Sequence, residues 1–181
     1  MRIIAGKYKS RKITPPKNLP VRPTTDRARE SLFNVLNNLV DFREITALDL
    51  FSGTGAISFE LVSRGCNEVT AVDQNRQCVE WIRNATKNFQ IENLQIRQAD
   101  SFRFMTQSPQ KYHLIFADPP YNMNRIEDIS RQVFKNDLLK EDGWLVIEHP
   151  KEIDFSEQQY FSGHRKYGKV NFSFFHFVNN G

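Results

Sequence analysis

The sequence is poor in cysteine and contains no long apolar run. Its 181 residues include two cysteines, Cys66 and Cys78, which are too few for a disulfide framework and lack the spacing of zinc ligands. No segment approaches the roughly 20 apolar residues that span a bilayer. The opening MRIIAGKYKSRK has no apolar core of signal-peptide length. These absences argue against a disulfide-rich secreted protein and a membrane protein, and we expect a cytoplasmic chain with reduced thiols.

Histidine is also scarce, and its placement indicates no metal centre. The four histidines are scattered without the spacing of metal ligands, so no bound metal is expected. Of the residues that are present, 39% are hydrophobic and 25% are charged, which suits a globular protein with one main core. A chain of 181 residues favours a single domain with an appendage over two full domains.

Positive charge is concentrated at the N-terminal end. Residues 1–29 carry nine Lys or Arg and one acid, a net charge of +8, whereas the other residues carry 16 basic and 20 acidic side chains, a net charge of −4. A basic arm on a mildly acidic body is typical of proteins that bind nucleic acid through its phosphates. A basic end that is merely solvated is the alternative.

From residue 46 onward, short apolar runs alternate with segments of helical periodicity. This alternation predicts an α/β, doubly wound fold, in which a parallel sheet is covered by helices on both faces. The aromatic-rich segments around 159–162 and 170–178 are expected to form a closing hairpin. The expected strands cover 46–51, 68–73, 94–100, 111–118 and 143–149, and the expected helices cover 56–64, 75–89, 102–105 and 126–139.

The N-terminal part is expected to divide into an arm and linker, residues 1–22, and a domain that covers 23–181. In the arm, residues 3–5 and 11–13 are placed to pair as a small basic β-hairpin, because a turn-prone segment separates them. Three prolines then indicate an extended linker. A helix is expected after Pro23, with Thr24 or Thr25 as its N-cap.

The first expected strand ends in DLFSGTG (49–55), which has the features of a ligand-binding turn. In an open parallel sheet, ligands bind at the carboxyl ends of the strands. Gly53 and Gly55 let the backbone pass close to a ligand. Ser58 replaces the third glycine of a dinucleotide fingerprint, and Asp49 would repel a pyrophosphate. Asp49 suits a ligand with an ammonium group, and S-adenosyl-L-methionine has an ammonium, a ribose and an adenine but no phosphate.

Carboxylates also end the second and third expected strands. Asp73 lies 24 residues after Asp49, where an acid can accept both hydroxyls of a ribose. Asp100 closes the third strand in the corresponding place. Together with the glycine turn, these acids predict S-adenosyl-L-methionine as the cofactor.

The stretch LIFADPPY (114–121) ends the fourth expected strand in a rigid polar corner. Its two prolines restrict φ, so that acceptors at this corner stay aimed. If Asp118 and the carbonyl of Pro119 accept the two N–H bonds of an exocyclic base amine, the nitrogen lone pair is directed at a methyl donor. Tyr121 provides a flat surface on which a flipped-out base can stack. The structural alternative is a strand end with a proline turn and ordinary tyrosine packing.

These motifs, together with RPTTDRARESLFN (22–34), resemble the 16S ribosomal RNA guanine-N2 methyltransferases, the RsmD-like family. The resemblance extends over essentially the whole chain. It implies a Rossmann-like class I methyltransferase fold with an N-terminal β-hairpin extension, and methylation of one guanine amine in 16S rRNA. It implies that Asp49, Gly53 and Gly55 line the methionine end of the cofactor, that Asp73 holds the ribose and Asp100 the adenine, and that Asp118, Pro119 and Tyr121 hold the base. The family often has Glu at position 73 and Phe at position 121, and either replacement keeps the role.

RNA contacts are expected from the arm and from the start of the first helix. The residues at the start of the helix could hold RNA phosphates or the carboxylate of the cofactor, or form a capped helix with a solvated basic face. These residues are Arg22, Thr24, Thr25, Arg27 and Arg29. Glu148 and His149 could face the site or simply end a strand. The residues expected to contact RNA are Arg2, Lys7, Lys9, Arg11, Lys12, Arg22, Thr24 and Arg27.

Two other functions compete with methylation of 16S rRNA or a partly assembled 30S subunit. DNA adenine or cytosine amine methyltransferases share a DPPY-type corner, but they usually need a sizeable target-recognition domain. A noncatalytic RNA-binding assembly factor would not need Asp118 or the glycines. The two cysteines lack the proline-cysteine context of cytosine-C5 methylation, which disfavours a covalent cysteine route.

Overall fold

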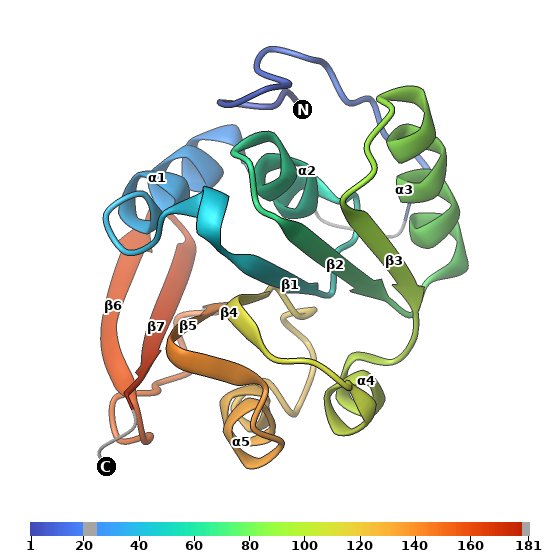
Figure 1. The fold of residues 1–181 in the computed structure, drawn as a ribbon. Helices are drawn as coiled ribbons and strands as arrows, with labels where there is room; N and C mark the ends of the chain where they lie inside the picture. Colours follow the sequence, from blue (N-terminus) through green and yellow to red (C-terminus); the bar gives the residue numbers. More distant parts are fainter. Residues whose placement is uncertain (20–24, 179–181) are drawn as a thin grey trace.

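The computed structural model describes residues 1–19 and 25–178 (Figure 1). Its centre is a seven-stranded sheet with the order β3-β2-β1-β4-β5-β7-β6. β1 to β5 run parallel, whereas β7 is antiparallel to β5, and β6 is antiparallel to β7. The strands are β1 (Thr46–Leu50), β2 (Glu68–Asp73), β3 (Leu94–Gln98), β4 (Tyr112–Ala117), β5 (Leu139–His149), β6 (Phe161–Tyr167) and β7 (Val170–Phe177). The helices are α1 (Asp26–Leu36), the 3-10 helix η1 (Phe42–Glu44), α2 (Ala56–Ser63), α3 (Arg76–Asn88), α4 (Ser101–Gln107) and α5 (Asp128–Lys135).

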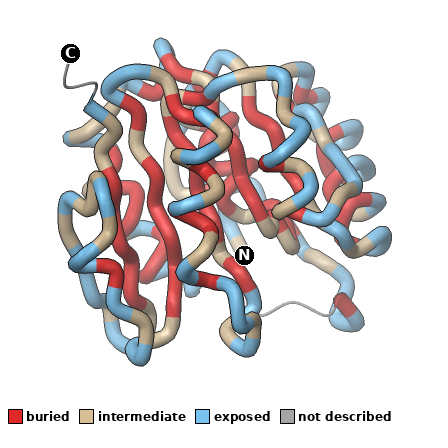
Figure 2. The backbone as a smooth tube through the Cα atoms, turned by 90° about the horizontal axis from the view of Figure 1, so that it is seen from below, coloured by how far each residue is buried: buried red, intermediate tan, exposed pale blue. Residues whose placement is uncertain are grey.

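Two hydrophobic clusters, one on each face of the sheet, hold these elements together. The first packs the apolar sides of α1, α2 and α3 on the sheet, and the second packs those of α4 and α5. In Figure 1 the first three helices lie above the sheet and the other two below it. The central strands are buried along almost their whole length (Figure 2), as expected for parallel strands covered on both sides. The predicted doubly wound α/β fold is confirmed. Within the described ranges, no helix has the length and apolar character needed to cross a membrane.

The strand order reverses between β1 and β4, and this reversal creates the crevice that holds the candidate site. Leu50 at the end of β1 pairs with Val72 of β2 on one side and with Ala117 of β4 on the other. The glycine turn, Asp73 and Asp118 therefore follow three neighbouring strand ends. Such a reversal is the usual ligand site of an open α/β sheet.

Several element boundaries differ from the sequence prediction. The helix expected to reach residue 139 ends at Lys135, because Asp137 adopts a left-handed φ of 53° and turns the chain. The Leu138 carbonyl then accepts a hydrogen bond from the Tyr112 amide at 2.8 Å, so β5 begins at Leu139 rather than at 143. The first strand of the closing hairpin is β6, which overlaps the end of the expected segment 159–162 and extends beyond it to Tyr167.

The N-terminal arm pairs its two ends as predicted but forms no extended strands. An antiparallel bridge joins Arg2 to Lys12, and the Ile13 amide donates to the Met1 carbonyl at 2.9 Å. Ile3, Tyr8 and Ile13 are buried in the same cluster as α1, α2 and α3. The arm is therefore part of the core on that face of the sheet. The expected boundary at residues 22 and 23 lies outside the described residues.

Buried polar side chains of α2 hold the backbone of the arm. Glu60 is 0% exposed, and its carboxylate accepts hydrogen bonds from the amides of Ile4 (2.8 Å) and Ala5 (3.1 Å). Its other donor is Arg64, whose Nε lies 2.9 Å away. Ser63 Oγ donates to the Ala5 carbonyl and accepts from the Tyr8 amide. A buried charge of this kind is tolerated only when it is fully hydrogen-bonded, so the arm and α2 require each other.

Gly6→Ala should destabilise the protein strongly, because the arm passes α2 at contact distance here. Gly6 has φ +83°, and a Cβ at this position would lie 1.8 Å from the Ser63 carbonyl oxygen. Gly168→Ala is the matched control, since Gly168 also has a positive φ (+64°) but has no atom within 4 Å of its would-be Cβ. We expect a loss of about 1 kcal/mol in the control from backbone strain alone, and a loss at least ~2 kcal/mol larger for Gly6→Ala. Urea unfolding measures both, and equal losses would show that the arm packs loosely.

Candidate active site

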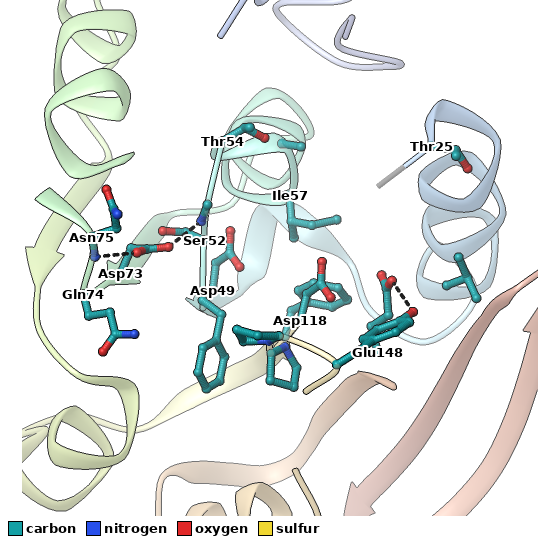
Figure 3. Close-up of a pocket in the computed structure, with 18 residues that line it drawn as sticks. Thr25, Asp49, Ser52, Thr54, Ile57, Asp73, Gln74, Asn75, Asp118 and Glu148 are labelled. Atoms are coloured by element: carbon teal, nitrogen blue, oxygen red, sulfur yellow. Dashed lines mark hydrogen bonds between the residues drawn. The ribbon is translucent and has the colours of Figure 1, made fainter. Parts of the chain in front are cut away.

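A cavity of about 460 Å³ opens at the carboxyl ends of β1, β2 and β4, where the strand order reverses. Figure 3 shows the 18 residues that line it. Most of them come from four places along the chain: the end of β1 with the glycine turn that leads into α2, the end of β2, the end of β4 with the DPPY corner, and the end of β5. Thr25 at the start of α1 and Val170 at the start of β7 complete the lining.

Asp49 is a buried carboxyl group at the inner end of the cavity. Its side chain is in β1 and is 1% exposed. Asp49 Oδ2 accepts hydrogen bonds from the Ser58 amide (3.1 Å) and the Ser58 hydroxyl (2.5 Å) in the first turn of α2. Burial raises the pKa of Asp49 to about 7, against the opposing effect of the Ser58 hydrogen bonds, and the neighbouring Asp73 raises it further. The structure thus places Asp49 in the predicted site as a carboxyl group that titrates near neutrality.

Asp73 orders the turn that surrounds the cavity. Its Oδ2 accepts from the Gly53 amide at 2.7 Å, and its Oδ1 accepts from the Asn75 amide at 2.8 Å. Asp73 and Gly53 both line the cavity, as predicted. Because each carboxylate oxygen has two acceptor sites, these two bonds leave capacity for further donors such as ribose hydroxyls.

The two glycines of the turn have different roles. Gly53 lines the cavity, whereas Gly55 is buried and is not part of the lining. Gly55 has φ +77°, and a Cβ there would lie 2.9 Å from the ring of Phe59. This glycine is therefore required where the turn enters α2.

Asp100, like Gly55, lies outside the cavity lining, whereas the predicted cofactor residues Asp49, Gly53 and Asp73 belong to it. β3 ends at Gln98, and Asp100 is the exposed N-cap of α4, where its Oδ1 accepts from the Arg103 amide at 2.9 Å. Its position after β3 places it one strand beyond Asp73 at the same edge of the sheet.

The DPPY corner projects into the cavity from the end of β4. Asp118, Pro119, Pro120 and Tyr121 all line it, as predicted. Figure 3 shows the carboxyl groups of Asp118 and Glu148 pointing into the same space, below Ile57. The Tyr121 hydroxyl donates to Glu148 Oε1 at 3.0 Å. The corner therefore presents carboxyl oxygens and an aromatic ring to one cavity.

Glu148 is the site residue that the sequence left ambiguous. It is 5% exposed and lines the cavity, whereas His149 is 2% exposed and lies outside the lining. His149 contacts the Pro150 carbonyl (2.9 Å) and the Ser173 hydroxyl (2.8 Å), and burial lowers its pKa. Because Glu148 lies one residue before the end of a strand, the sequence indicated that it could belong to the site. Which face of the sheet its side chain occupies followed only from the pairing of β5 with β4.

The cysteines are poorly suited to a covalent mechanism. Burial raises the pKa of Cys66 to about 12 and that of Cys78 to about 11. Both thiols are buried, so neither is ready to form the thiolate that a nucleophilic role requires.

The basic arm meets the cavity rim at Met1, whereas Arg11 lies over Phe89, the residue that follows α3. The start of the arm reaches the cavity rim, because the Thr54 hydroxyl contacts Met1 Sδ at 3.7 Å and Thr54 lines the cavity. The Arg11 guanidinium lies 5.1 Å from the ring centroid of Tyr8. The predicted RNA-contacting residues Arg2, Lys7, Lys9, Arg11, Lys12 and Arg27 are all exposed, and Arg22 and Thr24 lie outside the described residues.

The start of α1 is a capped helix in which Arg27 is exposed and Arg29 is buried. Thr25 is the N-cap, and its hydroxyl accepts from the Ala28 amide at 3.2 Å. Arg29 is 1% exposed and donates to the Arg2 carbonyl (2.5 Å) and to Asp26 (2.9 Å). This arginine ties α1 to the arm.

Comparisons with known proteins agree with this geometry. The model of the family described as "Conserved hypothetical protein 95" matches residues 1–176. The chain is 30% identical to "Ribosomal RNA small subunit methyltransferase D" of Escherichia coli (strain K12), over 82% of this chain and 71% of that protein. It resembles the structure of "Putative methyltransferase yhhF from Escherichia coli", with a TM-score of 0.86, 25% identity and 98% coverage of each chain. A more distant structure, 18% identical with a TM-score of 0.66, is described as "SMU.776, a putative methyltransferase complexed with SAH", and it shares the fold over 82% of this chain and 49% of that one.

Asp49→Asn should become increasingly stabilising, relative to wild type, as the pH rises from about 4 to about 7. The pKa of Asp49 is raised from 3.8 to about 7 by folding, so the folded chain keeps a proton that the unfolded chain loses in this window. Stability of the wild type falls accordingly as pH rises, and the contribution is fully lost above about 7. Asparagine remains neutral throughout. Urea unfolding of the ligand-free protein across this range would show the difference, and parallel pH profiles for the two proteins would contradict the raised pKa.

Proposed function

Because the chain belongs to the conserved hypothetical protein 95 family, together with ribosomal RNA small subunit methyltransferase D, we propose that it methylates the exocyclic N2 amine of one guanine in 16S rRNA. It is a ribosomal RNA methyltransferase, and its methyl donor is S-adenosyl-L-methionine. The substrate is 16S rRNA, free or within a partly assembled 30S subunit, and the enzyme acts in the cytoplasm.

One observation carries the proposal: the glycine turn after β1 and the DPPY corner after β4 line the same cavity. Two acids, Asp49 and Asp73, lie beside the glycine turn and would repel a phosphate. This binding site suits a ligand without phosphate, such as an amino acid attached to a nucleoside. The corner provides acceptors and a ring, which suit a planar amine. A purely RNA-binding assembly factor would need neither feature in this arrangement.

The cofactor would lie along the strand ends from β1 towards β3. Asp49 would face the ammonium of the methionine part, and this cation would favour the ionised form of a carboxyl group whose pKa is raised to about 7. Asp73 would accept the ribose hydroxyls, and Gly53 would allow close approach of the backbone. Asp100, at the end of β3, would be placed towards the adenine.

When bound, S-adenosyl-L-methionine supplies a methyl group on a positively charged sulfur. Asp118 and the Pro119 carbonyl would accept the two N–H bonds of the guanine amine and aim its lone pair at that methyl. With the cofactor bound, the new N–C bond would be balanced by loss of the C–S bond, whose electrons would remain on a neutral thioether sulfur. The amine would then lose a proton, which Asp118 would accept. The ring of Tyr121 would support the flipped-out base throughout.

Asp118→Ala should reduce methyl transfer by around two to three orders of magnitude, because it removes one preorganised acceptor at the reacting amine. Labelled S-adenosyl-L-methionine is incubated with 16S rRNA, with 30S particles and with DNA, and the product is identified by nuclease digestion and mass spectrometry. Asp142→Ala is the control, since the Asp142 side chain is 78% exposed and lies at the opposite end of β5.

Three outcomes would count against the proposal. Label in DNA alone would favour the DNA amine methyltransferase, and label in no nucleic acid would favour the noncatalytic factor. An Asp118→Ala enzyme with the wild-type rate would show that the corner is only a strand end. As a check on cofactor binding, the affinity for S-adenosylhomocysteine is measured by calorimetry. It should stay near the wild-type value in both Asp118→Ala and Asp142→Ala.

Replacing Lys9 and Lys12 by Gln should weaken RNA binding and flatten its salt dependence. Both side chains are exposed on the arm, and each phosphate contact to single-stranded RNA that is lost should lower the log–log slope by about 0.7. The matched control replaces Lys135 and Lys151, which are also exposed but lie elsewhere on the surface. Filter binding at several salt concentrations measures the slopes. Equal slopes for the two double variants would mean that the arm is a solvated basic end.

A further inference from the structure

Glu148 lies beside Asp118 in the cavity because β4 and β5 are paired in the sheet. Ala117 pairs with Ile147, so Asp118 and Glu148 are the next residues on two neighbouring parallel strands. Ala117 and Ile147 belong to one hydrophobic cluster, and Phe116 and Val146 belong to the other. Because side chains alternate along strands, Glu148 follows Phe116 and Val146 to the face that carries the cavity.

The environment of Glu148 fixes its carboxyl group rather than leaving it in solvent. The residue is 5% exposed, and its Oε1 accepts the hydroxyl hydrogen of Tyr121 at 3.0 Å. Figure 3 shows this bond and the carboxyl group of Asp118 facing the same space. A carboxylate has about four acceptor sites, so the bond from Tyr121 is compatible with a hydrogen bond from a bound base.

We propose that Glu148 reads the N1–H group of the target guanine and so restricts the enzyme to guanine; this inference rests on the proposed function. In guanine, the ring N1–H donor lies next to the N2 amine, so two neighbouring acceptors match two neighbouring donors. Adenine and cytosine also carry an exocyclic amine, but the adjacent ring nitrogen is an acceptor. A carboxylate that faces that nitrogen repels it and leaves two buried acceptors without a hydrogen.

Tyr121 gains a second role in this arrangement. Its ring provides the stacking surface, and its hydroxyl holds the Glu148 carboxylate in place for the base edge. Phenylalanine at this position would keep the ring and release the carboxylate. Tyr121 is therefore a positioning residue with respect to Glu148, and Glu148 itself contacts the substrate.

The test uses 2-aminopurine, a base that keeps the 2-amine but has an acceptor at N1. The modified nucleotide is first mapped with wild-type enzyme. 16S rRNA is then assembled from transcribed flanks and a synthetic fragment with guanine or 2-aminopurine at that position, and is used both free and in reconstituted 30S particles. The measured quantity is the ratio of kcat/KM for guanine to kcat/KM for 2-aminopurine.

The wild-type ratio should be about tenfold or more, the scale of one good base-edge contact. Glu148→Gln should lower the rate on guanine and raise the rate on 2-aminopurine, because the amide can donate to N1, so that the ratio falls towards one. Tyr121→Phe should lower the ratio less than Glu148→Gln does, because the carboxylate is still present but is no longer held by the hydroxyl.

Specific results would overturn the inference. If Glu148→Gln lowers the rates on guanine and on 2-aminopurine in the same proportion, Glu148 only maintains the structure of the site and does not distinguish the two bases. If Tyr121→Phe changes the ratio as much as Glu148→Gln, the discrimination comes from the tyrosine. A wild-type enzyme that methylates both bases equally would also contradict the contact. A wild-type enzyme that methylates no guanine contradicts the proposed function itself, and the inference falls with it.

Discussion

The pairing of β1 with β4 is the constraint on which the site depends. These two strands are far apart in sequence, yet Leu50 and Ala117 are direct partners in the sheet. As a result, the glycine turn after β1 and the DPPY corner after β4 line the same cavity. Both strands are buried on both faces, so a shift of register would disrupt two hydrophobic clusters at once. Stability of the core and geometry of the site are thus determined by the same contacts.

Much of this arrangement could be predicted from the sequence, because its signals are local. The apolar runs that end in DLFSGTG and LIFADPPY each indicate a buried strand with a polar end, and the order of strands and helices places those ends together. What could not be predicted depends on contacts across the chain. Glu60 looks like an ordinary helix residue, and its bonds to the arm join positions 55 and 56 residues apart. The early end of α5 depends on the left-handed conformation of Asp137, which the apolar spacing around it does not indicate.

Asp49 and Glu148 illustrate two ways in which a carboxyl group is held in this cavity. Asp49 is fixed by an amide and a hydroxyl from the first turn of α2, where the helix dipole favours negative charge, although burial opposes it. Glu148 is fixed by a phenolic hydroxyl from the neighbouring corner. The first arrangement suits a group that meets a cation, and the second suits a group that meets a base edge. The sequence shows both acids, but only the contacts around them separate the two roles.

The docking of the arm on α2 has a consequence for how RNA is bound. Basic segments that contact nucleic acid are often disordered until they bind, and ordering them costs conformational entropy that reduces affinity. Here Ile3, Tyr8 and Ile13 are already buried, and the backbone between them is held by Glu60 and Ser63. The entropy of ordering this backbone is lost during folding, so in the proposed complex RNA would immobilise only the exposed ends of the lysine and arginine side chains. The arm would then be a rigid spacer between the phosphates and the target base of that proposed complex.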